Sequence, residues 1–426
     1  MIEYFEIEGQ WWLPDNPADK VSGILKFEPQ NKILLHLNGK FPLKIENIEF
    51  IHGNSTDGKP ITLHDTFYTH LSNTQDYVIN FIFVGMHFKK LNDISFSNIN
   101  VRYAHLNEWL GIHGFQALQF DANKNPSKIE HVLPKPITIQ INSSFRFSFI
   151  FRSIIPSITF PPFEETIKQF AFVEFLYMRK KYFKKVFADF IHFQNFLTLA
   201  FQSPAYPLEI TGSFGKKNNR TFIKIYYQIN EAKNIDNIIR VSKMLMPYEY
   251  IQNKFPSLIQ NWYEKKHSFE TIFIPYIRRF YNTGMYDEDQ FMDLARGLDA
   301  YYRDFLKQVH TQSIHRANNR NLKKKPIYYK EKLTYIFKKH SNQFNAILKI
   351  KQYSKFAEKI VKYRNDFAHS NPISIDPYEK MKKLDKLSEK LRLIVSCIIL
   401  NHHGLDEGEI EQLVSKSILY RHLLNN

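Results

Sequence analysis

The stretch KQYSKFAEKIVKYRNDFAH (351–369) has the spacing of an amphipathic helix that ends on an arginine and a histidine five residues apart. Its apolar side chains recur every three or four residues and form one stripe: Phe356, Ile360, Tyr363 and Phe367. At about 100° per residue, Arg364, Asn365 and His369 share a polar sector of roughly 140° away from that stripe. Because Pro372 disfavours helix in the residue before it, we expect the helix to end just after His369.

The polar sector could support cleavage of RNA by its own 2′-hydroxyl. That hydroxyl must lose a proton, the attacked phosphate must be stabilised, and the leaving 5′-oxygen must gain a proton. A histidine with a pKa near ~6.5 exchanges protons near neutrality, and an arginine stays charged and grips phosphate oxygens. Asn365 could orient the phosphate or the imidazole, and Asp366 lies at the edge of the sector. One helix offers only one Arg364 and one His369, so a dimer would supply two of each.

The same spacing has an ordinary explanation. An exposed histidine at a helix end often only caps the helix, and the Arg-x4-His spacing also occurs by chance in long chains. Spacing alone therefore leaves both interpretations open.

Positive charge is concentrated around this helix. The whole chain has 58 Lys and Arg against 42 Asp and Glu, a net charge of +16. Residues 315–392 hold 21 basic and 7 acidic residues, whereas residues 1–150 hold 13 and 15. A field of this size attracts a polyanion, with nucleic acid the first candidate and an anionic membrane a weaker one. We expect RNA to contact Lys323, Lys324, Lys325 and Lys362.

The rest of the C-terminal section also predicts helices. Residues 287–309 begin with acidic residues and place their apolar side chains on one face. Residues 330–348 and 377–404 predict two more helices, and the basic segment 315–326 predicts a loop. Together with 351–369 they predict a four-helix core with a short helical tail.

The N-terminal part predicts β-structure. Alternating or β-branched runs at 21–27, 32–39 and 76–85 are separated by turn sequences, which indicates a mainly antiparallel sheet or sandwich. After the break FPPFEE (160–165), apolar residues three and four apart predict a helix up to about Ala200.

The middle of the chain is mixed. Residues 206–213 and 221–229 predict two strands around a turn, and helices resume at 248–265 and 269–282. We therefore expect an α+β fold in three parts: a mainly antiparallel β domain at 1–155, a mixed α/β middle at 156–283 and an all-α helical bundle at 284–426.

Several classes of protein are disfavoured. A single cysteine, Cys397, excludes an internal disulfide framework and a thiolate zinc site. Its apolar run of about ten residues is shorter than the roughly 20 that span a bilayer, and the N-terminus lacks the pattern of a signal peptide. The sequence contains no phosphate loop, dinucleotide fingerprint or nucleophile elbow. The adjacent His402 and His403 diverge by about 100° on a helix and cannot easily share a metal. We expect a cytoplasmic protein without membrane contact, metal or cofactor.

Two segments of the C-terminal section resemble a known family. YRNDFAH (363–369) resembles the Arg-x4–6-His motif of HEPN-domain ribonucleases, in the form with Asn after Arg and His at the helix end. FMDLARGLDAYYRDF (291–305) resembles the first HEPN helix of the ApeA branch, which usually contains an "ALEAYHR"-like string. Here Asp299 stands in place of the Glu and Tyr302 in place of the His.

The N-terminal half is similar to the ApeA N-terminal domain. The similar segments are IEGQWWLPDNPADKVSGILKFEP (7–29), LLHLNGKF (34–41) and HLNEWLGIHGF (105–115). Residues 160–280 match only in general rhythm, so the resemblance covers both ends of the chain.

The resemblance implies a bacterial abortive-infection protein whose HEPN domain is a metal-independent ribonuclease acting as a homodimer, with tRNA as the first substrate to test. The N-terminal domain would sense infection through a phage-derived trigger or hold the nuclease in check. Arg364 would clamp the scissile phosphate, Asn365 would position it, and His369 would transfer a proton or orient the 2′-hydroxyl. Asp299 would hold Arg364 from behind, with Asp366 as a second supporting candidate.

Two other functions stay open on the sequence. A non-catalytic RNA-binding or interaction module could use the basic face with Tyr328, Tyr329 and Tyr335 as stacking residues. A nucleotide-sensing or toxin–antitoxin-type partner is the other. In the β domain a ligand pocket could form around Trp11, Trp12, Trp109 and His113, although core packing is the better explanation for the three tryptophans.

Overall fold

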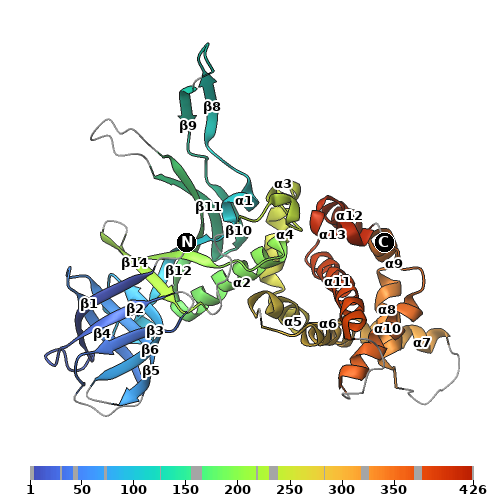
Figure 1. Cartoon of the computed structure of the whole chain (residues 1–426), viewed down its shortest axis with the longest axis horizontal. Coiled ribbons are helices and arrows are strands. Elements are labelled where there is room, and N and C mark those ends of the chain that lie inside the picture. The colour runs from blue at the N-terminus through green and yellow to red at the C-terminus, as the bar shows by residue number, and fades with distance from the viewer. Residues whose placement is uncertain are drawn as a thin grey trace. The chain divides into compact units, whose positions relative to one another are not determined.

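The computed structural model describes residues 4–28, 31–41, 47–71, 74–124, 126–154, 166–216, 219–229, 238–282, 284–317, 326–368 and 377–424. The chain forms two compact units, which are described separately. A β unit comprises Met1–Asn195 and Ala205–Ile239, and a helical unit comprises Phe196–Pro204 and Arg240–Asn426. The predicted α+β fold class is confirmed (Figure 1). The three-part division stays a prediction, and residues of its middle part occur in both units.

Six antiparallel strands close into a barrel in the β unit. They are β1 (Phe5–Trp12), β2 (Val21–Phe27), β3 (Ile33–Leu37), β4 (Asn47–Ser55), β5 (Pro60–Leu71) and β6 (Gln75–Val84). Their order is β6-β3-β2-β1-β4-β5, and β5 pairs back onto β6. Trp11 lies fully buried and donates from Nε1 to the Gly23 carbonyl at 3.1 Å. A Cβ on Gly53 would lie 2.2 Å from the Trp11 ring, so this glycine makes room for the indole.

The sheet continues beyond the barrel because β6 is shared. Residues 75–79 of β6 pair with β3, whereas 81–84 pair with β14 on the same edge. From there the antiparallel order is β14-β13-β7-β12-β11-β10. The strands are β14 (Asn219–Tyr227), β13 (Pro207–Lys216), β7 (Ser95–Tyr103), β12 (Lys168–Tyr182), β11 (Phe145–Ile154) and β10 (Ile137–Asn142). The predicted strand pair around 206–229 is confirmed as the β13–β14 hairpin. The expected mainly antiparallel sheet is also confirmed, and part of it closes into a barrel that is joined to an open sheet.

The helix predicted between residue 165 and about Ala200 was wrong across roughly the first half of its length. Residues 168–182 form β12, and helix α2 (Phe183–Phe201) begins only afterwards. Ala171, Val173 and Phe175 are buried at a spacing of two, which is the period of a strand. Pairing with β11 on one edge and β7 on the other outweighs the spacing of three that suggested a helix. The FPPFEE break lies outside the described residues.

The remaining elements of the β unit are short. Phe193 of α2 packs on the open sheet, with ring centroids 5.3 Å from Phe147 and 6.3 Å from Phe175. A separate two-stranded sheet and two short helices complete the unit: β8 (Phe115–Phe120), β9 (Pro126–His131), α1 (Leu106–Leu110) and the 3-10 helix η1 (Leu91–Asp93).

The helical unit contains the predicted helices, and several of them are interrupted. Residues 287–309 form α6 (Asp287–Tyr301), a π-helical turn η3 (Tyr302–Leu306) and the start of α7 (Lys307–Ala317). Residues 330–348 break at His340 into α8 (Tyr329–Lys339) and α9 (Ser341–Leu348). Helix α6 packs against α5, α10 and α11, and α8 packs against α10. The other elements are η2 (Val241–Lys243), α3 (Tyr248–Ile251), α4 (Phe255–Glu264), α5 (Glu270–Tyr281), α10 (Tyr353–Ala368), α11 (Pro377–His402), α12 (Glu407–Lys416) and α13 (Ile418–Leu424). Within the described ranges, no helix combines the length and apolar character needed to cross a membrane.

Two buried histidines make the helical unit sensitive to acid. His403 is 3% exposed and donates from Nδ1 to the Ile399 carbonyl at 2.7 Å. His340 is 5% exposed and shares a hydrogen bond of 3.1 Å with the Tyr301 hydroxyl. Burial lowers the pKa of His403 to about 3 and the pKa of His340 to about 4. The folded protein therefore keeps both rings neutral where the unfolded chain would charge them.

We expect the free energy of unfolding to fall as pH drops from about 6.5 toward 4, because over that range the unfolded chain binds protons that the folded chain does not. Each of the two rings contributes on the order of 3 kcal/mol. Urea unfolding between neutral and mildly acidic pH measures this effect. His403→Gln should flatten the pH dependence, because it removes a ring that stays neutral in the folded protein. An equal pH dependence in the wild type and the His403→Gln protein would contradict the assignment.

Candidate active site

Helix α10 carries the arginine motif, and its apolar stripe faces the bundle as predicted. Ile360 is fully buried, and Phe356 packs against helix α8. Near the end of α10, the rings of Tyr363 and Phe367 lie 6.2 Å and 5.8 Å from the ring of Phe291 on α6. These contacts hold the last two turns of α10 and turn the polar residues of the motif away from the core.

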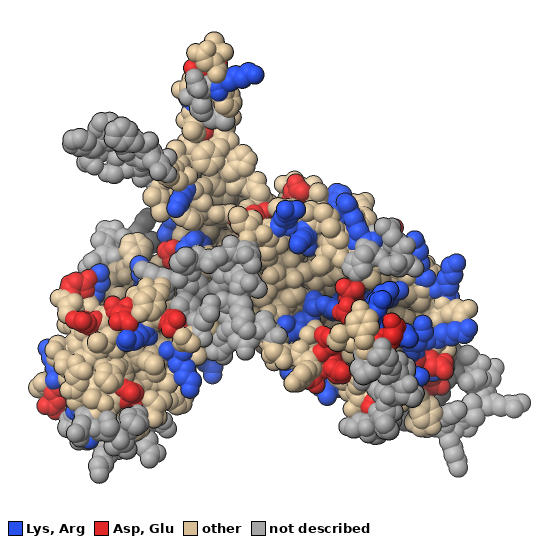
Figure 2. Space-filling view, in the orientation of Figure 1, with Lys and Arg blue, Asp and Glu red and all other residues tan. Residues whose placement is uncertain are grey.

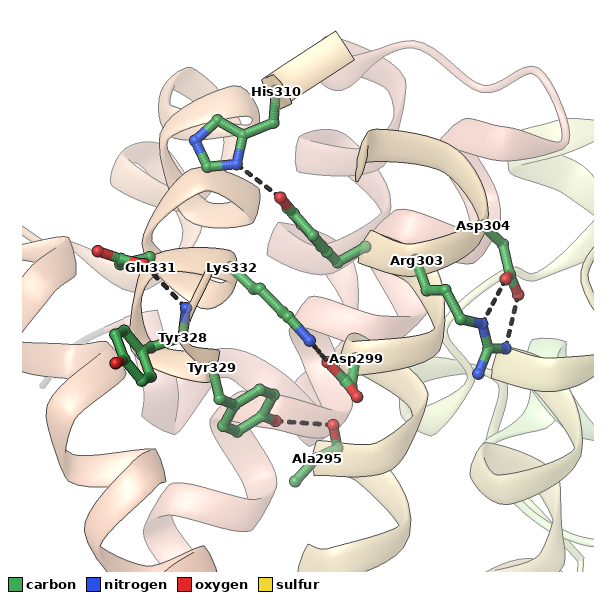
Figure 3. A network of polar contacts seen from close by, with 10 residues as sticks. Ala295, Asp299, Arg303, Asp304, His310, Tyr328, Tyr329, Glu331 and Lys332 are labelled. Atoms are coloured by element: carbon green, nitrogen blue, oxygen red, sulfur yellow. Dashed lines mark hydrogen bonds and ion pairs between the residues drawn. The ribbon is translucent and has the colours of Figure 1, made fainter. Parts of the chain in front are cut away.

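Arg364 is half-buried and rests on an aromatic ring. Its Cζ lies 4.9 Å from the ring centroid of Tyr329, at the start of α8. The Tyr329 hydroxyl donates to the Ala295 carbonyl of α6 at 2.7 Å (Figure 3). Burial raises the pKa of Tyr329, and the charge of Asp299 adds to the rise while Arg364 opposes it. Tyr329 thus stays neutral and offers its ring face to the guanidinium, so α6 and α8 together fix where Arg364 lies.

Asp299 is engaged by a lysine. Its Oδ1 lies 2.9 Å from Nζ of Lys332 (Figure 3), and that ammonium is also 5.7 Å from the ring centroid of Tyr302. Among the residues that the structure describes, no ion pair joins Asp299 to Arg364. The supporting role of Asp299 stays a prediction, and any such role would act through Lys332 and Tyr329.

The other predicted site residues divide into two groups. Lys362 and Asn365 are exposed and Asp366 is half-buried, all on the last turns of α10. His369 lies outside the described residues, directly after the end of α10. Three further predicted positions also lie outside the described residues: Lys323, Lys324 and Lys325. The pairing of Arg364 with His369 is therefore a prediction from their spacing.

A histidine that the sequence analysis missed lies beside this cluster. His310 shares a hydrogen bond of 2.7 Å with the Tyr302 hydroxyl (Figure 3). Its ring also stacks on Tyr335, with the two ring centroids 3.9 Å apart. In a regular α-helix, positions 302 and 310 differ by about 80°. The π-helical turn inserts roughly one residue and brings them to within about 20° of each other. Sequence spacing alone gave no sign of this turn. Burial lowers the pKa of His310.

Arg303, three residues before the end of the π turn, is held away from the motif. Its Nε and Nη2 bond the carboxylate of the adjacent Asp304 at 2.7 Å and 3.1 Å (Figure 3). Asp304 also accepts a hydrogen bond of 2.9 Å from Thr271 on α5. Arg303 therefore helps to join α5 to the π turn, and its charge is balanced locally.

Comparison with protein families gives two matches, one after the other along the chain. Residues 6–262 match the family described as ApeA N-terminal domain 1. Residues 276–409 match the family described as Apea-like HEPN, and this range contains α6, α8, α10 and α11. No curated protein and no solved structure shows significant similarity to the chain.

Proposed function

Because the chain belongs to the ApeA-like family, with an ApeA N-terminal domain followed by an Apea-like HEPN domain of the ribonuclease type, we propose that it is a metal-independent endoribonuclease of anti-phage abortive infection. The observation that carries the proposal is the position of Arg364. Arg364 lies near the end of α10, next to the exposed Asn365, and its guanidinium rests on the ring of Tyr329 at the start of α8. An arginine fixed in this way is suited to gripping a phosphate.

The proposed reaction is a transesterification within the RNA. His369 of one protomer takes the proton from the 2′-hydroxyl, and the resulting oxygen attacks the adjacent phosphorus. The bond from phosphorus to the 5′-oxygen breaks, and His369 of the second protomer gives that oxygen a proton. Arg364 from each protomer stabilises the charge on the non-bridging oxygens, and Asn365 orients the phosphate. The products are a 2′,3′-cyclic phosphate and a 5′-hydroxyl, and no water or metal enters this step.

The β unit would supply regulation. In this proposal the β unit either binds a phage-derived trigger or inhibits the nuclease in the cytoplasm before infection. tRNA is the first substrate to test, because its loops present unpaired nucleotides whose 2′-hydroxyls can align for attack.

The non-catalytic RNA-binding module is the competing function, and two of its three tyrosines are already engaged. Tyr329 lies under Arg364, and Tyr335 stacks on His310. Tyr328 is 60% exposed and could stack on a base. The binding module requires three tyrosine rings that can stack on bases, and only Tyr328 among the three is available, so the structure supports this alternative less well.

Incubation of the purified protein with tRNA should give fragments with 5′-hydroxyl ends and 2′,3′-cyclic or 3′-phosphate ends. Excess EDTA should leave the rate unchanged, because the 2′-hydroxyl is the nucleophile and histidines move the protons. Kinase labelling of fragments without prior phosphatase treatment identifies the 5′-hydroxyl ends. RNA that is bound but recovered intact would favour the binding module, and loss of cutting in EDTA would contradict the proposed chemistry.

A further inference from the structure

A groove of about 520 Å³ lies on the outer face of the barrel in the β unit. Strands β1, β2 and β4 form its floor, and its size is in the range of sites that hold a small organic ligand. Trp11 is buried inside the barrel, so alternation along β1 turns the residues on either side of it outward. Six polar side chains line the groove: Glu8, Gln10, Lys20, Ser22, Asn38 and Asn54.

Cross-strand pairing places several of these side chains next to one another. Gln10 lies opposite Ser22 of β2 and opposite Asn54 of β4. Because neighbouring strands are about 4.7–4.9 Å apart, this row presents a hydroxyl and two amides at that spacing. Asn38 extends the row beyond β2, since its backbone N–H donates to the Ser22 carbonyl. The floor of the groove therefore offers hydrogen-bond donors and acceptors from positions that regular strands hold in place.

The polar side chains of the floor have no partners inside the described part of the chain. No hydrogen bond or ion pair there engages the side chains of Glu8, Gln10, Ser22, Asn38 and Asn54. The Oδ1 atom of Asn54 is shielded from solvent and still receives no hydrogen bond. Buried polar atoms of folded proteins are nearly always hydrogen-bonded, so this oxygen indicates a donor that comes from outside the protein.

The groove has little net charge. Glu8 lies toward one end of it, and Lys20 lies at the other end, where its Nζ is 5.1 Å from the ring centroid of Trp12. In Figure 2, acidic and basic side chains are interspersed over the barrel on the face in view. A nucleic acid or polyphosphate requires a surplus of positive charge, which the groove lacks. Its polar floor also disfavours a lipid or another apolar ligand, because the amides would lose water without gaining partners.

The closed barrel also argues against a peptide that adds as a strand. Such a peptide bonds the free backbone edge of a sheet, whereas β1 is paired with β2 on one edge and with β4 on the other. A ligand in the groove must therefore be recognised by side chains.

The side chains of the groove suit the hydroxyls of a sugar. An amide or a carboxylate takes two hydrogen bonds at once from hydroxyls on adjacent carbons of a sugar ring. Trp12 packs edge-on against the rings of His52 and His87, so a fixed apolar wall at one end faces the C–H groups of such a ring. We propose that this groove is a binding site for an uncharged oligosaccharide, held by the row of Ser22, Gln10 and Asn54.

Saturation-transfer NMR with the whole protein tests this proposal. The probes are cellotriose, maltotriose and triacetylchitotriose, which together cover α and β linkages and an N-acetylated ring. At least one of them should receive saturation from the wild type, and its affinity should be insensitive to salt because binding neutralises no charge. Changing Gln10 and Asn54 together to Ala should weaken binding about tenfold or more, because two hydrogen-bonding side chains are lost.

The matched control changes Asn92 and Gln116 to Ala. Both are exposed amides of the β unit that do not line the groove, so this protein should bind the saccharide like the wild type. Ser22→Trp is an independent variant, since a large side chain in the row fills the groove and should abolish binding. Urea unfolding should give wild-type stability for the Gln10 and Asn54 double variant, because neither side chain bonds the described part of the protein.

Three results would overturn the saccharide site. They are no saturation transfer to any of the three probes, equal affinities in the groove variant and the control, and wild-type binding by Ser22→Trp. The inference goes beyond the proposed nuclease and does not depend on it, because the measurement contains no RNA. Saccharide binding by a protein that never cuts RNA would support the groove and refute only the proposed catalysis.

Discussion

Replacing Arg364 or His369 with alanine should abolish detectable RNA cleavage while the protein stays folded. Loss of a general acid or base slows such reactions by about 10² to 10⁴, and loss of one group that stabilises the developing charge slows them by about 10² to 10³. In a composite dimer each substitution removes both copies at once, so the effects should lie at the upper end. Gel analysis of tRNA fragments over time measures the rate, and thermal unfolding checks the fold.

Two substitutions of the same chemical kind serve as controls. Arg421→Ala and His267→Ala change exposed residues outside the motif, and both proteins should cut RNA at the wild-type rate. Full activity in the His369→Ala protein would refute the catalytic assignment. RNA whose 2′-hydroxyls are methylated cannot be cut by the proposed reaction and can be used to measure binding. Its binding should survive in the His369→Ala protein and weaken in the Arg364→Ala protein, because only the arginine always has a positive charge with which to bind the phosphate.

Replacing Phe291 with alanine should destabilise the helical unit and loosen the end of α10 in particular. Phe291 is fully buried, and its ring contacts Tyr363 and Phe367 on the last two turns of that helix. Truncating a buried phenylalanine costs about 3–5 kcal/mol. Hydrogen exchange of the amides at 360–368 should therefore quicken, and RNA cleavage should fall because Arg364 and Asn365 lie on the loosened turns.

Phe344→Ala is the matched control for this experiment. Phe344 is also fully buried, and it lies on α9, where it packs against Phe337 and His340. Its loss should lower the free energy of unfolding by a similar amount and leave the end of α10 protected below the unfolding transition. Equal exchange rates at 360–368 in the two variants would show that Phe291 has no special role in holding the motif.

Local periodicity predicted the motif helix well and the middle of the chain poorly. The α10 stripe has no competing period, so its core face and polar face could both be identified. Residues 168–182 contain apolar side chains at spacings of two and of three, and only pairing with β11 and β7 decides between strand and helix. Closure of the barrel depends likewise on which strands meet, such as β1 with β4, and alternation within a strand does not contain that information.

The surroundings of Arg364 show the same limit at the scale of single residues. Its aromatic partner Tyr329 is 35 residues earlier in the chain. The sequence suggests this ring only as an RNA-stacking residue of the alternative binding module, and it suggests Asp299 as the partner of the arginine. The hydrogen bond between Tyr302 and His310 depends on a π-helical turn, and no pattern of residues in the sequence predicts that turn. Residue types with the right chemistry could be picked out, whereas their partners depend on helix packing.

The shared strand β6 has a consequence for the evolution and engineering of the β unit. One edge of β6 pairs with β3 at residues 75–79 and with β14 at residues 81–84. The barrel and the open sheet therefore share this strand. A chain cut after β6 would leave the second half of that edge unpaired beside a hydrophobic strand, which invites association with other copies. The barrel alone is therefore not expected to fold as an independent domain, and recombination that exchanges N-terminal units between relatives should place its crossovers outside residues 5–227.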